Sequence, residues 1–114
     1  MTTRHQIRLT TRGRHSGQPR TVTLYAWEGE GSLVVVGSAG GRARHPAWAL
    51  NLRATPEAQV AQGKEQRTVR AREPAGKERD RLWERVTEAF PLYATYQRRT
   101  SRTLPIFVLE DAPD

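Results

Sequence analysis

The chain has 114 residues, 36% of them hydrophobic, and its 19 Lys and Arg against 12 Asp and Glu give a net charge of +7. We expect residues 1–114 to form one domain. The chain contains no cysteine, which excludes disulfide scaffolds, zinc ribbons and thiol catalysis, and no apolar run approaches the ~20 residues of a membrane span. Because the N-terminus also lacks the apolar segment of a secretory signal, we expect a cytoplasmic protein that does not insert stably into membranes.

The first half is predicted to be a series of strands. Apolar and polar residues alternate in two segments, separated by a loop of turn-forming and basic residues at 11–19. A Gly-containing turn at 28–31 leads into a third strand, in which the run 33–36 predicts burial on both faces. The three predicted strands are residues 7–10, 20–27 and 32–38.

The second half mixes helices with a further hairpin. A flexible loop at 37–45 is followed by a short helix that begins with Pro46. Helical periodicity returns after residue 76, with Leu82, Val86, Ala89 and Phe90 on one apolar stripe. The predicted elements are helices at 46–53, 76–90 and 92–99, and strands at 57–62, 65–72 and 104–109. This order predicts an α+β fold, mainly antiparallel β, in which five or six strands form a sheet or small barrel flanked by short helices.

The positive charge lies mostly in the first half of the chain. Residues 1–56 contain eight Arg and two acidic residues, a net charge of +6, whereas residues 57–114 contain eleven Lys or Arg and ten acidic residues, a net charge of +1. Seventeen of the 19 basic residues are Arg, whose planar guanidinium suits phosphate and carboxylate groups. We therefore predict that an anionic ligand contacts the N-terminal half.

Two basic segments rich in glycine, residues 12–17 and 38–44, are candidates for that contact. Glycines allow backbone amides to approach an anion closely, and the nearby Arg side chains add charge. Neither segment has the Gly-Lys-Ser/Thr ending of a Walker loop or the fingerprint of a dinucleotide-binding βαβ unit. Their spacing alone leaves phosphate binding and simple surface turns both open.

Two helical segments carry further candidates. Trp48, Asn51 and Leu52 share one side of the first predicted helix. Two interpretations are open: Trp48 and Leu52 pack into the core with Asn51 as a helix cap, or this side of the helix contacts a ligand. Tyr93 and Tyr96 lie three residues apart and share a helix face. They either fill part of the hydrophobic core, or form an aromatic wall around a bound substrate with a phenol as hydrogen-bond donor.

A metal site is not expected. The three histidines, His5, His15 and His45, have no partner at the spacing of metal ligands.

The motifs together resemble the deazaflavin-dependent nitroreductase family, which includes proteins like the F420H2-dependent quinone reductases. The resemblance rests on TTRGRHSGQPR at 10–20, SAGG at 38–41, HPAW at 45–48 followed by Asn51-Leu52, and YATYQRRT at 93–100. It implies a split β-barrel that binds coenzyme F420, whose phosphodiester and polyglutamate tail are strongly anionic. It also implies hydride transfer from the reduced deazaflavin to a small-molecule acceptor: a quinone, an activated alkene or a nitro compound.

The resemblance also implies roles for individual residues. One group would line the phosphate and tail groove, a second would offer backbone amides to the phosphate and ring, and a third would pack on the ring. Tyr93 would be the proton donor, with Tyr96 and Phe90 in the substrate pocket. The residues implied in cofactor binding are Arg14, His15, Ser16, Gly17 and Arg20 for the groove; Ser38, Ala39, Gly40 and Gly41 for the amides; Pro46, Trp48 and Asn51 for the ring; and Arg44 as an additional cation.

Some positions depart from the family pattern. Ala39 and His15 stand where relatives often have Lys, and Phe90 where they often have Tyr. Only about nine residues precede Thr10, where relatives commonly have an N-terminal helix, so we expect a more open pocket.

Three alternatives remain at this point. The barrel could bind FMN, which also has a phosphate and a tricyclic ring. It could carry a deazaflavin without catalysis. A nucleic-acid-binding barrel is disfavoured, because the aromatic residues are not interleaved with Arg on one strand face. The resemblance leaves monomer and homodimer both open.

Overall fold

The computed structural model describes residues 3–29 and 31–113, which fold into a β-barrel with helices on one side. The strands are β1 (Thr3–Arg12), β2 (Pro19–Gly29), β3 (Ser32–Val36), β4 (Glu57–Gln62), β5 (Glu65–Arg72) and β6 (Ile106–Asp111); the helices are the 3₁₀ helix η1 (Ala39–Gly41), α1 (Ala47–Ala54), α2 (Gly76–Ala89) and α3 (Leu92–Arg98).

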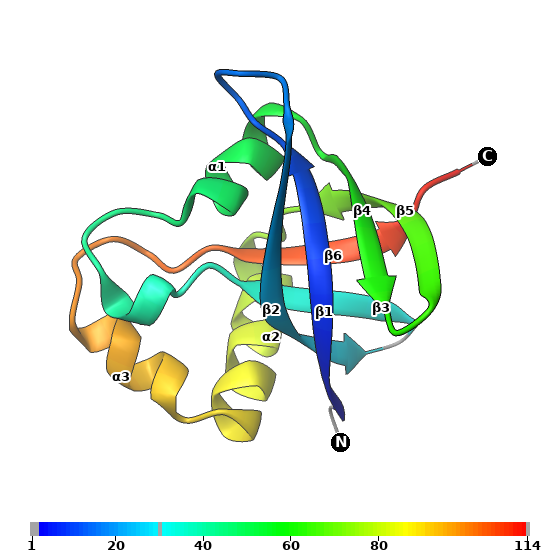
Figure 1. The fold of residues 1–114 in the computed structure, drawn as a ribbon. Helices are drawn as coiled ribbons and strands as arrows, with labels where there is room; N and C mark the ends of the chain where they lie inside the picture. Colours follow the sequence, from blue (N-terminus) through cyan, green and yellow to red (C-terminus); the bar gives the residue numbers. More distant parts are fainter. Residues whose placement is uncertain (1–2, 30, 114) are drawn as a thin grey trace.

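The strands form a closed barrel in the order β1-β2-β3-β6-β5-β4 (Figure 1). All the neighbouring strands pair antiparallel, and the pairing of Leu9 in β1 with Val60 in β4 closes the barrel. Figure 1 also shows that the loop between β1 and β2 lies beside α1. The prediction of five or six mainly antiparallel strands flanked by short helices is therefore confirmed, and of the two arrangements left open, a sheet or a small barrel, the structure has the closed barrel.

The barrel interior contains the first hydrophobic core. Period-two alternation turns residues such as Ile7 and Leu9 of β1 inward, where they are at most 1% exposed. Helix α1 contributes Trp48 and Leu52 to the same core, and the Trp48 ring lies 6.0 Å from the ring of Phe107. Because α1 is anchored by these contacts, its polar residues take fixed positions beside the β1–β2 loop.

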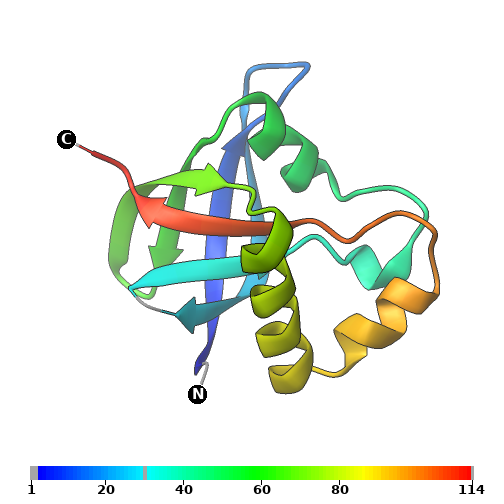
Figure 2. The same cartoon turned by 180° about the vertical axis from the view of Figure 1, so that it is seen from behind.

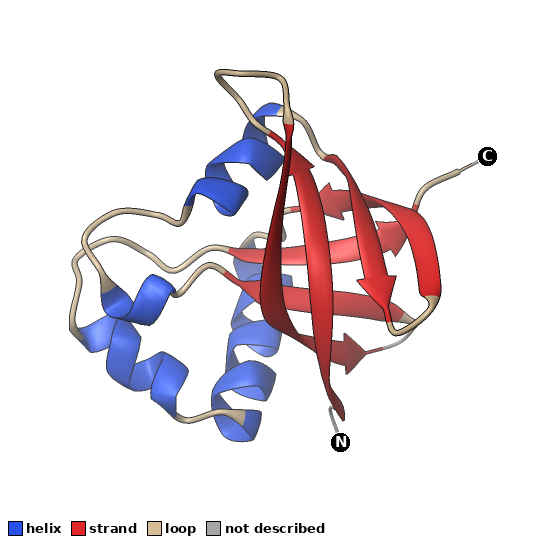
Figure 3. Ribbon diagram, in the orientation of Figure 1, coloured by secondary structure: helices blue, strands red, loops and turns tan. Residues whose placement is uncertain are grey.

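A second core lies outside the barrel, between β3 and β6 and the helices α2 and α3. Val34 and Val36 of β3 pack there with Val86 of α2 and Tyr93 of α3. Figure 2 shows α2 running beside these strands, and Figure 3 shows the helices gathered on one side of the barrel. Leu33 and Val35 face the interior core, which confirms the predicted burial of the 33–36 run on both faces.

Several predicted boundaries change in the structure. The hairpin of β4 and β5 has the predicted bounds, but β1 extends well beyond residues 7–10, and η1 lies within a predicted loop. Glu30 of the predicted turn lies outside the described residues. Ala89 is exposed, so its assignment to the apolar stripe of α2 is wrong. Trp83, three residues before Val86, is half-buried and packs against the second core. Within the described residues, no helix has the length and apolar character needed to cross a membrane.

Candidate functional site

Two neighbouring cavities meet at Trp48, on the side of the barrel that carries the helices. The first, of about 560 Å³, lies between the β1–β2 loop and α1, and we call it the cationic cavity. Its lining residues are Thr11, Gly13, Arg14, His15, Ser16, Pro19, Arg20, Thr21, Val22, Ala47, Trp48 and Asn51.

The second cavity, of about 340 Å³, lies between β2, η1 and α3, and we call it the aromatic cavity. Trp48 belongs to both linings, so the two cavities adjoin at this residue. The residues that line the aromatic cavity are Thr23, Leu24, Tyr25, Val36, Ser38, Ala39, Gly40, Pro46, Trp48, Phe90, Tyr93 and Tyr96.

Asn51 of α1 holds the loop that forms the cationic cavity. Its Oδ1 accepts hydrogen bonds from the backbone N–H of Arg14 at 3.1 Å and from Arg14 Nη1 at 3.2 Å. Its Nδ2 donates to Thr11 Oγ1 at 3.1 Å, and both Asn51 and Thr11 are buried. The side chain of Asn51 therefore does not cap the helix. It connects α1 to the end of β1 and fixes where the loop begins.

The cationic cavity presents two arginine side chains. Arg14 and Arg20 line it with their side chains exposed, as does His15, and no Asp or Glu is among the described residues that line it. Ser16 Oγ accepts hydrogen bonds from Arg20 Nη2 at 3.4 Å and from the Gln18 backbone at 3.1 Å, which brings Arg20 over the loop. This cavity is suited to a phosphate or carboxylate ligand.

The loop around η1 has an unusual backbone. Ala39, Gly40 and Gly41 have φ angles of 44°, 64° and 80°, and Ala39 is the one non-glycine with positive φ among the described residues. Gly41 packs against α3 so closely that an added Cβ would lie 2.6 Å from the Tyr96 carbonyl oxygen. Left-handed backbone at a non-glycine residue is costly and is concentrated at binding sites.

Tyr93 is buried and lines the aromatic cavity. Its Oη accepts a hydrogen bond from Trp27 Nε1 at 3.0 Å, and its ring lies 4.8 Å from that of Phe90. Burial raises the pKa of the Tyr93 phenol above its ordinary value, with the hydrogen bond from Trp27 opposing the shift. The phenol is therefore protonated near neutral pH, and its O–H is available to donate to a ligand.

Most of the predicted site residues lie in these cavities. Arg14, His15, Ser16, Arg20 and Asn51 line the cationic cavity; Ser38, Ala39, Gly40, Pro46, Phe90, Tyr93 and Tyr96 line the aromatic cavity; and Trp48 lines both. Three predicted residues line neither: Gly17 borders a separate groove with Arg12, Gly41 is buried beneath α3, and Arg44 is exposed.

Sequence reasoning missed several residues of the site. Thr11 falls in a predicted loop but lies in β1 and bonds Asn51. Trp27 falls in a predicted strand, and its indole N–H bonds the Tyr93 phenol. Both partners lie far away in the sequence, so no local pattern could have identified them. Tyr25, in contrast, lines the aromatic cavity and is 44% exposed, and its alternation in the sequence with the apolar Leu24 and Ala26 could have placed it on the outer face of its strand.

Comparison with known proteins identifies relatives across nearly the whole chain. Residues 1–111 match the family model of F420H(2)-dependent quinone reductase. An F420H(2)-dependent quinone reductase of Mycobacterium tuberculosis is 40% identical over 105 residues, which cover 89% of this chain and 70% of the relative.

Two solved structures have the same fold. One, described as an F420-H2 dependent reductase, superposes with a TM-score of 0.82 at 39% identity and covers 92% of this chain and 93% of its own. Another, described as a domain-swapped dimer, has the same TM-score and identity and covers 92% of this chain and 79% of its own. The resemblance seen in the sequence motifs is thereby confirmed. The chain belongs to the F420H(2)-dependent quinone reductase family of oxidoreductases, and its cofactor is coenzyme F420.

Proposed function

We propose that this protein transfers a hydride from reduced F420, held across the two cavities, to a quinone bound in the aromatic cavity. Activated alkenes and nitro compounds are further acceptor classes to test. The observation that carries the proposal is the junction at Trp48 of two cavities: a cationic one, with no acidic residue among the described residues that line it, and an aromatic one that contains a buried phenol.

The residues of the cationic cavity fit the anionic part of the cofactor. Arg14 and Arg20 can pair with phosphate or carboxylate oxygens through their guanidinium groups, and Ser16 adds a hydroxyl. F420 carries a phosphodiester and a polyglutamate tail, whereas FMN carries a single phosphate. Because F420 carries more negative charge, a lining with two arginines and no acidic residue among those described favours it over FMN as the ligand of this site.

The η1 loop and α1 fit the ring and the adjoining phosphate. The backbone hydrogen bonds within the loop use the amides of Gly41 and Arg42 as donors. Ser38, Ala39 and Gly40 precede them in the turn and line the cavity, where we propose that their backbone amides donate to the cofactor. Trp48, buried at the junction, would pack on the ring and exclude water from it.

Tyr93 supplies the proton in this proposal. Reduction of a quinone to the hydroquinone consumes one hydride, which the bound F420H2 supplies, and one proton, which the acceptor must gain from the protein or solvent. The Tyr93 O–H, kept protonated by burial, can hydrogen bond to the acceptor oxygen and donate as charge develops there.

The first test compares binding and turnover in Tyr93→Phe. We expect the F420 dissociation constant, measured by fluorescence titration, to stay within about twofold, while oxidation of F420H2 by a soluble quinone slows about a hundredfold. A parallel titration with FMN checks the choice of cofactor. Unchanged turnover in Tyr93→Phe would exclude the phenol as proton donor.

Trp27→Phe is the matched control. It removes the 3.0 Å hydrogen bond to the Tyr93 oxygen but keeps the phenol. If Tyr93→Phe acts through lost structure alone, the two variants should lose turnover equally. If the phenol donates the proton, Trp27→Phe should keep most of the activity.

We also propose that the chain can form a homodimer, because a solved relative at 39% identity is described as a domain-swapped dimer. Light scattering of the purified protein decides between dimer and monomer.

A further inference from the structure

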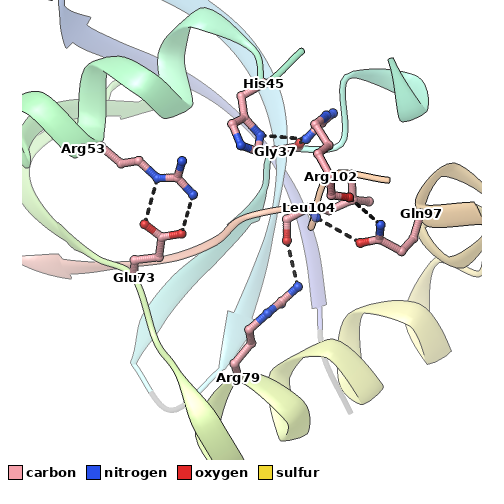
Figure 4. Close-up of polar contacts among 8 residues, drawn as sticks. All are labelled: Gly37, His45, Arg53, Glu73, Arg79, Gln97, Arg102 and Leu104. Atoms are coloured by element: carbon pink, nitrogen blue, oxygen red, sulfur yellow. Dashed lines mark hydrogen bonds and ion pairs between the residues drawn. The ribbon is translucent and has the colours of Figure 1, made fainter. Parts of the chain in front are cut away.

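Arg102, in the segment between α3 and β6, makes a dense set of hydrogen bonds beside the aromatic cavity (Figure 4). Its Nε donates to the carbonyl oxygen of Arg42 at 2.7 Å and its Nη2 to that of Ser38 at 2.7 Å. Its Nη1 donates to the carbonyl oxygen of Gly37 at 3.0 Å and to His45 Nδ1 at 2.9 Å. One guanidinium therefore contacts the backbone on both sides of η1.

The backbone that carries Arg102 is itself fixed by α3. Gln97 Nε2 donates to the carbonyl oxygen of Arg102 at 2.7 Å, and Gln97 Oε1 accepts from the backbone N–H of Leu104 at 2.9 Å. Figure 4 shows Gln97 reaching from its helix to this segment. Helix α3 also carries Tyr93 and Tyr96. The hydrogen bond between Gln97 and Arg102 therefore links the helix that forms the aromatic wall of the cavity to the η1 loop.

The η1 loop, which lies between the Ser38 and Arg42 carbonyl groups, has a backbone conformation that contacts outside the loop must stabilise. Three consecutive residues, Ala39, Gly40 and Gly41, have positive φ, and Ala39 is costly in that conformation. Within the described residues, the loop's own backbone bonds run from Gly41 to Ser38 and from Arg42 to Ala39. Charge-assisted bonds from a guanidinium to carbonyl oxygens are stronger than neutral ones, so Arg102 is suited to hold this turn.

We propose that Arg102 is a positioning residue for the cofactor: it holds the η1 loop in the shape that presents the amides of Ser38, Ala39 and Gly40 to F420. Arg102 does not line the cavity and so acts through the loop. This inference rests on the proposed placement of the cofactor against that loop. It predicts that the guanidinium sets the affinity for the cofactor without contacting it.

The test uses the full-length protein with Arg102→Met and, as the conservative change, Arg102→Lys. We expect Arg102→Met to weaken F420 binding at least about tenfold in a fluorescence titration, because several charge-assisted bonds to the loop are lost. Hydrogen–deuterium exchange of the cofactor-free protein should be faster in residues 37–42. Arg102→Lys has a compact ammonium that cannot reach three carbonyl groups at once. Its F420 affinity and its exchange rate should therefore lie between those of the unmodified protein and those of Arg102→Met.

Arg79→Met is the matched control. Arg79 also donates to a backbone carbonyl of this region, Leu104 O at 2.9 Å (Figure 4), but it is not among the described residues that line either cavity. Arg79→Met should lower the melting temperature while leaving the F420 dissociation constant within about twofold.

The inference is overturned if Arg102→Met binds F420 as tightly as the unmodified protein, or if both Met variants lose affinity in proportion to their lost thermal stability. If Arg102→Met does not fold, Arg102→Lys must show the weaker binding and the faster exchange. Failure of the unmodified protein to bind F420 would instead contradict the proposed function, and the exchange experiment would then still report whether Arg102 orders the loop.

Discussion

The two loops that meet at the proposed cofactor site are held in different ways. The β1–β2 loop is exposed and rich in cations, and its tertiary anchor is Asn51, which bonds its first residues. The η1 loop contributes backbone rather than charge, has three residues with positive φ, and is bonded on both sides by Arg102.

This difference separates two contributions to cofactor binding. Exposed cations attract an anion over a distance that depends on salt, and they tolerate movement of the side chains. Backbone amides act only at hydrogen-bond distance, so the loop that presents them must be rigid before the ligand arrives. We infer that the β1–β2 loop supplies charge and the η1 loop supplies shape.

The largest expected effect comes from adding a side chain to the η1 loop at Gly41. A Cβ there would lie 2.6 Å from the Tyr96 carbonyl oxygen and 2.9 Å from Arg99 Cβ, at a φ of +80°. We expect Gly41→Ala to lower the free energy of unfolding by about 2–4 kcal/mol, measured by chemical denaturation. Gly40→Ala, where φ is +64° but nothing lies within 4 Å, should cost only about 1–2 kcal/mol. Equal losses would mean that contact with α3 does not constrain the loop.

A smaller effect is expected when cations are removed from the β1–β2 loop. Arg14→Ala and Arg20→Ala should each weaken F420 binding by about two- to fivefold at low ionic strength. The difference from the unmodified protein should nearly disappear at ~500 mM salt, because exposed charges are screened. Titrations at both salt concentrations measure this. The weaker binding of Arg102→Met should persist in high salt, and a loss that salt abolished would assign Arg102 to the charge contribution instead.

The smallest expected effect is the response of the η1 loop to pH through His45. Burial lowers the pKa of His45 below its ordinary 6.5, with Arg102 and Arg53 adding to the shift and Glu73 opposing it. Because the folded-state pKa is the lower one, the unfolded chain binds the proton more tightly. Stability is therefore full above the ordinary pKa and falls as the pH drops from there through the folded-state pKa.

A protonated His45 also cannot accept the hydrogen bond from Arg102 Nη1. We therefore expect part of the decrease in the denaturation midpoint between about pH 7 and pH 5 to be absent from His45→Gln. His15→Gln, which changes an exposed histidine of the other loop, should keep that part of the pH dependence. The same pH profile in all three proteins would show that His45 does not titrate in this range.

The sequence by itself determined the local elements. The β4–β5 hairpin has its predicted bounds, because strand alternation and the Gly63 turn are both encoded within a few residues. Burial of residues 33–36 on both faces followed from their continuous apolar character. The excess of Arg in the first half indicated an anionic ligand, with the two glycine-rich loops as candidates for the contact, and the motifs indicated the family.

Only the tertiary structure decided how those elements combine into a site. Arg14 bonds a residue 37 positions away, Trp27 bonds Tyr93 66 positions away, and Arg102 reaches back 64 positions to Ser38. Periodicity reports which face of an element is buried, but it carries no information about which distant polar group will lie opposite. Those pairings were fixed when the barrel closed and packed α1 and α3 beside the two loops, because buried polar groups must then find partners within the fold.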